Sequence, residues 1–293
     1  MCAVFGFLDY KGKVSNAILK KLIHYLSVSA EVRGTDATGI AYVRDGSIVT
    51  YKKPKPAHKV KLFFPRGTRS VIGHTRFTTQ GSEKRNCNNH PFEGHCGTES
   101  FTLAHNGVLY NDRELRREQH LPPTPIETDS YIAVQLLEQG QQLDTENIKR
   151  MAELVEGSFV FTILRNDNTL FLVKGNNPLA LYHFPALGLY VYASTKSILD
   201  NCSLPRKTQK TDTQNEKNAP EHHVQERFLL PINGVLPLFY PFNFSSILAT
   251  CRKICLSVSL LLVSFSVSSF GLSVVVVAFF ANPFSPAALM IAG

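Results

Sequence analysis

The sequence predicts an α+β domain of layered strands and helices over residues 2–200. Strand-like runs come first, helical patterns follow, and strand-like runs return before residue 200. The hydrophobic fraction of 44% is enough to fill the core of such a domain. Charged residues are spread through residues 1–253 and are absent from Ile254 to Gly293, so the C-terminal region is interpreted separately.

The N-terminal third predicts a strand, a helix and a hairpin. The apolar run at residues 3–8 predicts a buried strand. Apolar residues at helical spacing predict a helix over residues 15–26, with Ser15 as its N-cap. Residues 39–53 contain two β-rich runs around an Asp-Gly pair at 45–46, which is typical of a hairpin with a type I′ turn.

The remaining elements follow the same alternation. Residues 70–77 and 100–107 each run from apolar residues into a polar, glycine-containing end, as strands that deliver functional loops do. Helices are predicted over residues 128–141 and 145–155. Four strand-like segments complete the domain: 158–164, 169–175, 179–184 and 188–194.

The character of the chain changes after residue 200. Residues 201–227 are polar and predict a disordered linker, and residues 228–293 form an apolar C-terminal segment. Residues 255–281 are long enough to span a bilayer as a helix. Arg252 and Lys253 precede this span and would keep the N-terminal domain cytosolic. The serine and β-branched content fits a strand equally well, and a tail that is not a selected structure is the third interpretation.

Charge and cysteine content exclude some classes of protein. The net charge of +8 includes a dense basic stretch from Lys52 to Arg69, which we interpret as a solvated face because no nucleic-acid-binding motif accompanies it. The six cysteines do not form the framework of a small secreted domain. The N-terminus has none of the features of a signal peptide, so a cytosolic, reducing setting is predicted.

Cys2 is the sharpest chemical feature of the sequence. A residue this small allows methionine aminopeptidase to remove Met1, which leaves one residue with both a thiol and a free α-amine. An α-amine has a pKa of about 8 and suits the role of general base at neutral pH. An N-terminal nucleophile therefore carries its own base. Many unrelated proteins begin Met-Cys, so Cys2 needs support from other segments.

Four segments supply that support: RGTDATGIA (33–41), GHTRFTTQG (73–81), AHNGVLYN (104–111) and ETDS (127–130). With the N-terminal MCAVFGF, they resemble the glutaminase domain of class II glutamine amidotransferases. This N-terminal-nucleophile group includes glucosamine-6-phosphate synthase and amidophosphoribosyltransferase. The resemblance covers roughly residues 2–200. It implies a four-layer αββα sandwich of the Ntn-hydrolase type.

The resemblance also implies roles for individual residues. Cys2 would attack the carboxamide carbon of glutamine, form a γ-glutamyl thioester and release ammonia. The Asn106 side-chain amide and the Gly107 N–H match the oxyanion hole, and two uncharged donors after a strand suit a developing negative charge. Arg76 matches the residue that binds the substrate α-carboxylate, and Asp129 matches the carboxylate that holds the α-ammonium.

Further residues are placed near the site by the same resemblance. Thr79 lies in the substrate loop with Arg76 and is expected to bind substrate. Arg33 and Gly34 match a structural motif near the nucleophile. His74 and His105, within two of the matching segments, are expected to support the site structurally.

A second interpretation of one segment is a zinc site. Cys87, His90, His95 and Cys96 offer four nitrogen and sulfur ligands, but their spacing matches no standard zinc finger. The resemblance explains His90 better, because a similar Asn-x-His-Pro segment follows the substrate loop in the family. We therefore predict no metal and no cofactor.

The predicted function is hydrolysis of glutamine to glutamate and ammonia. About ninety residues follow residue 200, which is too few for a synthase domain, so the predicted ammonia acceptor is a separate synthase chain. Nucleic acid is not a predicted partner. A membrane is a predicted partner only through the apolar C-terminal segment.

Two other functions stay open at this point. Ala3, Phe77 and Gln80 depart from the family pattern, which fits a catalytically silent regulatory or interaction module with the same fold. An N-terminal-nucleophile hydrolase acting on another amide is the other alternative, although Arg76 together with Asp129 favours a free amino acid as substrate.

Overall fold

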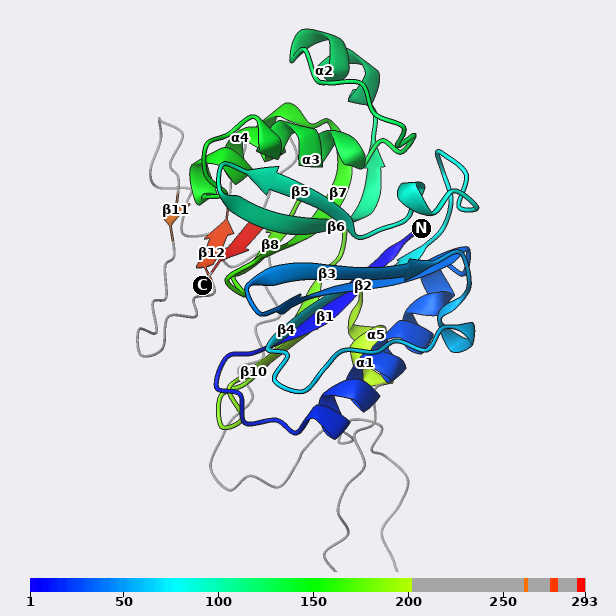
Figure 1. Cartoon of the computed structure of the whole chain (residues 1–293), viewed down its shortest axis with the longest axis vertical. Helices are drawn as coiled ribbons and strands as arrows, with labels where there is room; N and C mark the ends of the chain where they lie inside the picture. The colour runs from blue at the N-terminus through cyan, green and yellow to red at the C-terminus, as the bar shows by residue number, and fades with distance from the viewer. Residues whose placement is uncertain (202–260, 263–274, 279–288, 293) are drawn as a thin grey trace, which may run out of the picture.

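Two antiparallel β-sheets, packed face to face, make up the middle of the protein (Figure 1). The computed structural model describes residues 1–201 and, in the C-terminal region, 261–262, 275–278 and 289–292. The elements in chain order are β1 (Ala3–Asp9), α1 (Asn16–Ala30), η1 (Glu31–Arg33), β2 (Ala37–Arg44), β3 (Ser47–Lys53), η2 (Ala57–Lys59), β4 (Ser70–Arg76), η3 (Asn86–Asn88), β5 (Phe92–Cys96), β6 (Glu99–Leu109), α2 (Asp112–Glu118), α3 (Tyr131–Glu138), α4 (Thr145–Leu154), β7 (Gly157–Arg165), β8 (Leu170–Lys174), β9 (Ala180–Phe184), β10 (Leu189–Ala193), α5 (Lys196–Asp200), β11 (Leu261–Leu262), β12 (Val275–Ala278) and β13 (Leu289–Ala292).

The strand order places the start of the chain in the middle of one sheet. The first sheet has the order β3-β2-β4-β1-β10-β9, and the second has the order β11-β12-β13-β8-β7-β6-β5. Strand β1 pairs with β4 on one side, with Ala3 opposite Thr75, and with β10 on the other side. Its N-terminal end is therefore fixed by hydrogen bonds to both neighbours.

Helices cover the outer face of each sheet, and three apolar cores separate the four layers. Helices α1 and α5 lie on the first sheet, and α3 and α4 lie on the second, as Figure 1 shows. Strand β1 explains the arrangement, because Phe5 and Phe7 face α1 while Val4 and Leu8 face the second sheet. Both faces are buried, so the strand has no polar side chain from Ala3 to Leu8. The predicted αββα sandwich is confirmed.

Local signals located most elements correctly. Ser15 caps α1 by accepting a hydrogen bond from the Ile18 amide. The β2–β3 hairpin turns at Asp45 and Gly46, which both have positive φ (50° and 73°), as the predicted type I′ turn requires. Helix α3 is shorter than its predicted range of 128–141.

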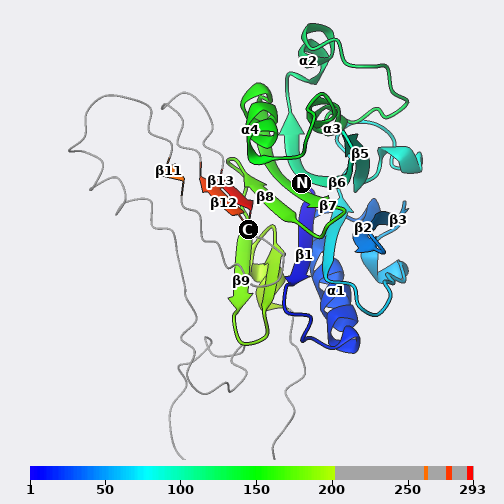
Figure 2. The ribbon, with the colours of Figure 1, turned by 60° about the vertical axis from the view of Figure 1, so that its left-hand side comes forward.

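Among the α-helices and strands of residues 1–201, three were not predicted from the sequence: β5, α2 and α5. Helix α2 has mostly charged residues and buries Leu115 as its main apolar contact, so it lacks the apolar stripe that marks a helix in sequence. It extends away from the layers in Figures 1 and 2. Strand β5 is short and ends at Cys96, in the segment we had considered for zinc.

Most of the C-terminal region lies outside the described residues. The predicted linker at 201–227 lies there except for residue 201, and so does most of the apolar segment at 228–293. Within the candidate membrane span 255–281, residues 261–262 and 275–278 are strands rather than helix. No helix among the described residues is long and apolar enough to cross a membrane. For the remainder of the span, the anchor stays a prediction.

The three C-terminal strands extend the second sheet beyond β8. Strand β13 pairs antiparallel with β8, with Met290 opposite Val173, and β12 and β11 follow outward (Figure 2). The interpretation of the C-terminal segment as strand thus holds at these residues.

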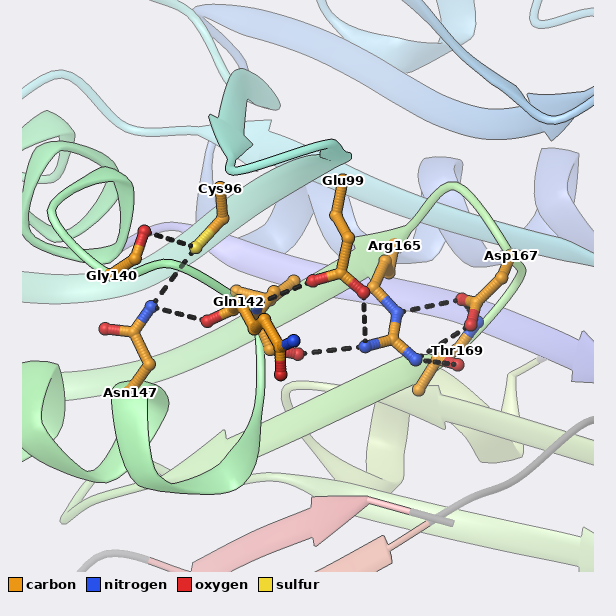
Figure 3. A network of polar contacts seen from close by, with 9 residues as sticks. Cys96, Glu99, Gly140, Gln142, Asn147, Arg165, Asp167 and Thr169 are labelled. Carbon is orange, nitrogen blue, oxygen red and sulfur yellow. Dashed lines mark hydrogen bonds and ion pairs between the residues drawn. The ribbon is translucent and has the colours of Figure 1, made fainter.

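A polar network holds the connector between α3 and α4 to the second sheet (Figure 3). The buried Asn147 amide donates to the Leu137 and Gln142 carbonyls at 2.9 and 3.0 Å and to Cys96 Sγ at 3.4 Å. Glu99 accepts from the amide of Leu143, and Arg165 donates to the carbonyl of the same residue. Both main-chain groups of Leu143 are thus satisfied by one ion pair.

We predict that Asn147→Ala destabilises the domain by about 2 kcal/mol, because it removes the hydrogen bonds of a buried amide to Leu137, Gln142 and Cys96. Urea unfolding at neutral pH measures the change. Glu153→Ala is the control, since Glu153 is exposed on the same helix and its loss should change the free energy of unfolding by less than about 0.5 kcal/mol. Equal stability of the two variants would contradict a structural role for the network.

Candidate active site

Five segments distant in sequence converge at one end of the two sheets. Cys2 directly precedes β1, Arg33 ends η1, and Arg76 ends β4. Asn106 lies within β6 of the second sheet, and Asp129 lies just before α3. Arg33 contacts both Cys2 and Asn106, so the three form a continuous set across the two sheets.

The Cys2 sulfur lies against the peptide chain at Phe77. The Phe77 amide donates to Sγ at 3.4 Å, and the Phe77 carbonyl lies 3.5 Å from it. Burial raises the pKa of the thiol, although the Phe77 N–H and the charge of Arg76 act in the opposite direction. The thiol therefore keeps its proton at neutral pH, and its use as a nucleophile requires a nearby base.

Arg33 connects the main chain of the nucleophile to the second sheet. Its Nε donates to the Cys2 carbonyl at 2.8 Å, and its Nη2 donates to Asn106 Oδ1 at 3.5 Å. Because the guanidinium holds the amide oxygen, the Asn106 amide nitrogen points elsewhere. Gly34 is required beside it, since a Cβ there would lie 2.6 Å from the Phe77 amide nitrogen.

Asn106 presents a donor without an acceptor. The residue is fully buried, and its Nδ2 has no hydrogen-bond partner in the described part of the chain. Its carbonyl is held by Asn177 Nδ2 at 2.8 Å. A buried unpaired donor costs about 1–3 kcal/mol, so this group is suited to an oxygen that arrives with a ligand. Gly107 follows with φ 157°, and a Cβ there would overlap the Ser158 carbonyl.

Three buried histidines lie behind these residues. His74 Nε2 donates to the His105 carbonyl at 2.9 Å, which ties β4 to β6 immediately before Asn106. The rings of His74 and His90 are 4.1 Å apart. Burial lowers the pKa of His74 to about 3 and also lowers the pKa values of His90 and His105. All three are therefore neutral at physiological pH.

Arg76 is buried, and the loop that follows β4 wraps around its guanidinium. Nη2 donates to the carbonyls of Gln80 and Gly81 at 2.7 and 2.9 Å, and Nη1 donates to Asn89 Oδ1 at 2.7 Å. An arginine has five N–H donors, so two remain for another partner. Thr79 is exposed on the same loop.

Asp129 is buried beside β6. Its Oδ2 accepts from the Leu109 amide at 2.7 Å, and Ser130 follows it. The Ser130 hydroxyl lies 2.8 Å from His105 Nδ1, and the opposite ring nitrogen lies 3.3 Å from the Ser158 carbonyl. Since a carbonyl only accepts, His105 carries its hydrogen on Nε2 and accepts from Ser130.

The structure brings together every predicted site residue except Thr79, whose side chain points to solvent. Sequence reasoning missed three supporting residues: Asn89, Asn177 and Lys52. The interpretation of Lys52 as part of a solvated face is wrong, because its ammonium is partly buried and binds two carbonyl groups. An Asn beside the matching His-Pro pair was the one available signal for Asn89.

The four residues considered for zinc do not converge. Cys96 belongs to the network in Figure 3, His90 packs between His74 and Phe92, and Cys87 is exposed. In the described residues, no cluster of three or more His, Cys, Asp or Glu side chains is arranged to hold a metal ion.

The site combines a protonated thiol, a buried amide donor, and a buried cation and anion. Such a set suits a substrate with an α-carboxylate, an α-ammonium and a carbonyl group to be attacked. Comparison with known proteins finds a family that acts on a substrate of this kind. The family model described as "Glutamine amidotransferase domain" matches residues 74–201.

Curated relatives agree with this match. Glutamine--fructose-6-phosphate aminotransferase [isomerizing] from Staphylococcus aureus (strain Mu50 / ATCC 700699) is 33% identical over 194 residues, covering 62% of this chain and 30% of the relative. The protein of the same name from Geobacillus kaustophilus is 31% identical over 188 residues, covering 61% of this chain and 30% of the relative. The chain thus spans under a third of the length of these relatives.

Solved structures share the fold. The B. subtilis glutamine phosphoribosylpyrophosphate amidotransferase in complex with ADP and GMP aligns with a TM-score of 0.54 and 21% identity, over 69% of this chain and 43% of that chain. A structure described as the allosteric regulatory enzyme of purine biosynthesis aligns with a TM-score of 0.55 and 21% identity, with the same coverage.

We predict that acid destabilises the domain through its buried histidines. The folded-state pKa of His74, about 3, lies below the ordinary value of 6.5, so the unfolded chain binds the proton first. Stability from this residue is complete above pH 6.5 and is lost as the pH falls towards 3. Between pH 7 and pH 5, His74 alone should lower the free energy of unfolding by about 2 kcal/mol. Urea unfolding at both pH values measures this, and no change would show that the fold does not lower the pKa of His74.

Proposed function

We propose that this chain contains a class II glutamine amidotransferase domain over residues 2–200 and hydrolyses glutamine to glutamate and ammonia. The observation that carries the proposal is the unpartnered Asn106 Nδ2, which lies in the same cluster as the Cys2 thiol. The proposal covers the domain, and the synthetic activity of the longer relatives is not part of it.

The reaction begins after removal of Met1. The freed α-amine of Cys2 then takes the thiol proton, which the raised pKa of the thiol makes necessary. The thiolate attacks the side-chain carboxamide carbon of glutamine. The proton passes to the leaving nitrogen, the carbon–nitrogen bond breaks, and ammonia departs. Water, deprotonated by the same amine, then attacks the γ-glutamyl thioester, so glutamate leaves and the thiol regains its proton.

Asn106 and Gly107 stabilise the tetrahedral intermediates of both steps. Asn106 Nδ2 is fixed before substrate arrives, because Arg33 holds the side-chain oxygen and Asn177 holds the main-chain carbonyl. A preorganised donor needs no rearrangement when negative charge develops, which is why such donors lower the barrier strongly. The Gly107 N–H is the proposed second donor.

Arg76 and Asp129 select an amino acid rather than a simple amide. The remaining donors of Arg76 bind the α-carboxylate, and Asp129 binds the α-ammonium. Both groups are almost fully buried, so their charges are screened little by solvent. Thr79 is the proposed further contact from the substrate loop.

We propose that an ammonia-accepting synthase works with this domain. The relatives' names describe transfer of an amino group to a sugar phosphate. Val32 and Phe77 are large exposed apolar residues beside Arg33 and Cys2. Such a surface next to the nucleophile suits a partner that receives ammonia without passing it through bulk water.

The first prediction concerns Cys2. Cys2→Ala should abolish glutamine hydrolysis, measured as glutamate release, because no nucleophile remains. Cys87→Ala is the matched control, since Cys87 is exposed and its sulfur contacts Asn88 rather than a residue of the proposed site. Intact mass with and without diazo-oxo-norleucine reports Met1 removal and labelling of Cys2 together. An unlabelled, inactive wild type would favour the catalytically silent module.

The second prediction concerns Asn106. Asn106→Ala should lower kcat by about 10²–10³-fold with a much smaller change in KM, because the lost donor acts in the transition state. Steady-state kinetics with L-glutamine measures both constants. A raised KM with an unchanged kcat would place Asn106 in substrate binding instead.

A further inference from the structure

Lys52 is a partly buried cation that binds the main chain of a neighbouring segment. It lies near the end of β3, and its Nζ donates to the carbonyls of Asn89 and Pro91 at 2.7 and 3.0 Å. The ammonium also lies 5.2 Å from the centre of the Phe92 ring. In return, Asn86 Nδ2 donates to the Lys52 carbonyl at 3.0 Å. The contacts fix residues 86–91 against the sheet.

The segment held by Lys52 is the one that holds Arg76. Asn89 accepts from Lys52 through its main-chain carbonyl and from Arg76 Nη1 through Oδ1, at 2.7 Å each. Its Nδ2 donates to the Glu83 carbonyl at 2.8 Å, in the loop that wraps Arg76. One residue therefore separates the Lys52 ammonium from the guanidinium, and the same residue braces the substrate loop.

The surroundings of Lys52 disfavour its positive charge on balance. Burial lowers the pKa of Lys52 to about 8, and the positive charge of Arg76 acts in the same direction. Glu93 of β5 and Cys87 of the held segment act in the opposite direction. A buried cation placed on two carbonyl groups, with no carboxylate in hydrogen-bond contact, is costly to keep for packing alone.

We propose that Lys52 is a positioning residue for substrate binding, which acts through Asn89 to fix the Arg76 guanidinium and the loop around it. The inference rests on the proposed function, since it assigns Arg76 to the α-carboxylate of glutamine. Without Lys52, the carbonyls of Asn89 and Pro91 lose their shared donor, and Asn89 Oδ1 is no longer held where Nη1 requires it. Arg76 then binds the carboxylate with a less ordered guanidinium.

The test compares Lys52→Met, Lys52→Arg and Lys53→Met. Lys53 is the matched control, because it is the next residue of the same strand and its side chain is exposed. Lys52→Met should raise KM for L-glutamine about tenfold and change kcat by less than about threefold, because binding rather than chemistry loses its support. Lys52→Arg keeps a cationic donor and should recover most of the loss. Lys53→Met should match wild type.

Binding without turnover separates this inference from the proposed function. Titration calorimetry of L-glutamine with Cys2→Ser chains, with and without Lys52→Met, should show the same tenfold weakening. An inactive wild type that still binds L-glutamine, with binding weakened by Lys52→Met, would overturn glutamine hydrolysis and support the role of Lys52. Equal KM and equal affinity for Lys52→Met and Lys53→Met would overturn the role of Lys52 and leave glutamine hydrolysis intact.

A pH series separates positioning by charge from a merely structural role. Lys52 loses its proton as the pH rises through about 8, so affinity for L-glutamine should fall between pH 7 and pH 9 in Cys2→Ser and in Cys2→Ser/Lys53→Met. The fall should be smaller in Cys2→Ser/Lys52→Met, where the other titrating groups are unchanged. Identical pH dependence in the three chains would overturn the proposal, whatever the effect of Lys52→Met on thermal stability.

Discussion

The pairing of β1 between β4 and β10 is the constraint on which the site depends. Strand β1 is paired with β4 from Ala3 and with β10 from Phe5, so the residue that directly precedes it is anchored although it belongs to a chain terminus. Cys2 occupies this position. The end of β4 lies beside it in register, which delivers Arg76 and the Phe77 peptide to the nucleophile. Termini usually fray, so an N-terminal nucleophile requires this kind of anchorage.

The second requirement is a link between the two sheets at the same end. Apolar packing between the sheets sets their distance but not the relative position of polar groups, because it is non-directional. Two hydrogen bonds supply the direction. Arg33 reaches Asn106 from the first sheet, and His74 reaches the His105 carbonyl. The Asn106 amide and the Cys2 thiol are thereby held together at one end of the two sheets.

The buried polar groups of the site order it, but burying them costs folding free energy. The neutral histidines, the unpartnered Asn106 amide and the buried Arg76 all lose hydration on folding. Their cost is offset by the three apolar cores and by hydrogen bonds that satisfy most of the remaining groups. In the loop after β4, the carbonyl groups of Gln80 and Gly81 are likewise satisfied, because Arg76 donates to both.

The sequence by itself determined the layered fold and most of its elements, and it named the residues proposed for the site. Ser15 and the Asp45-Gly46 turn act through neighbouring residues, so their effect can be read locally. The matching segments around Arg76 and Asn106 named the site. Only the tertiary structure decided the role of Lys52 and Asn177, which contact residues 37 and 71 positions away. A lysine in an edge strand looks solvated until a distant segment folds over it, because burial is set by long-range packing rather than by local sequence.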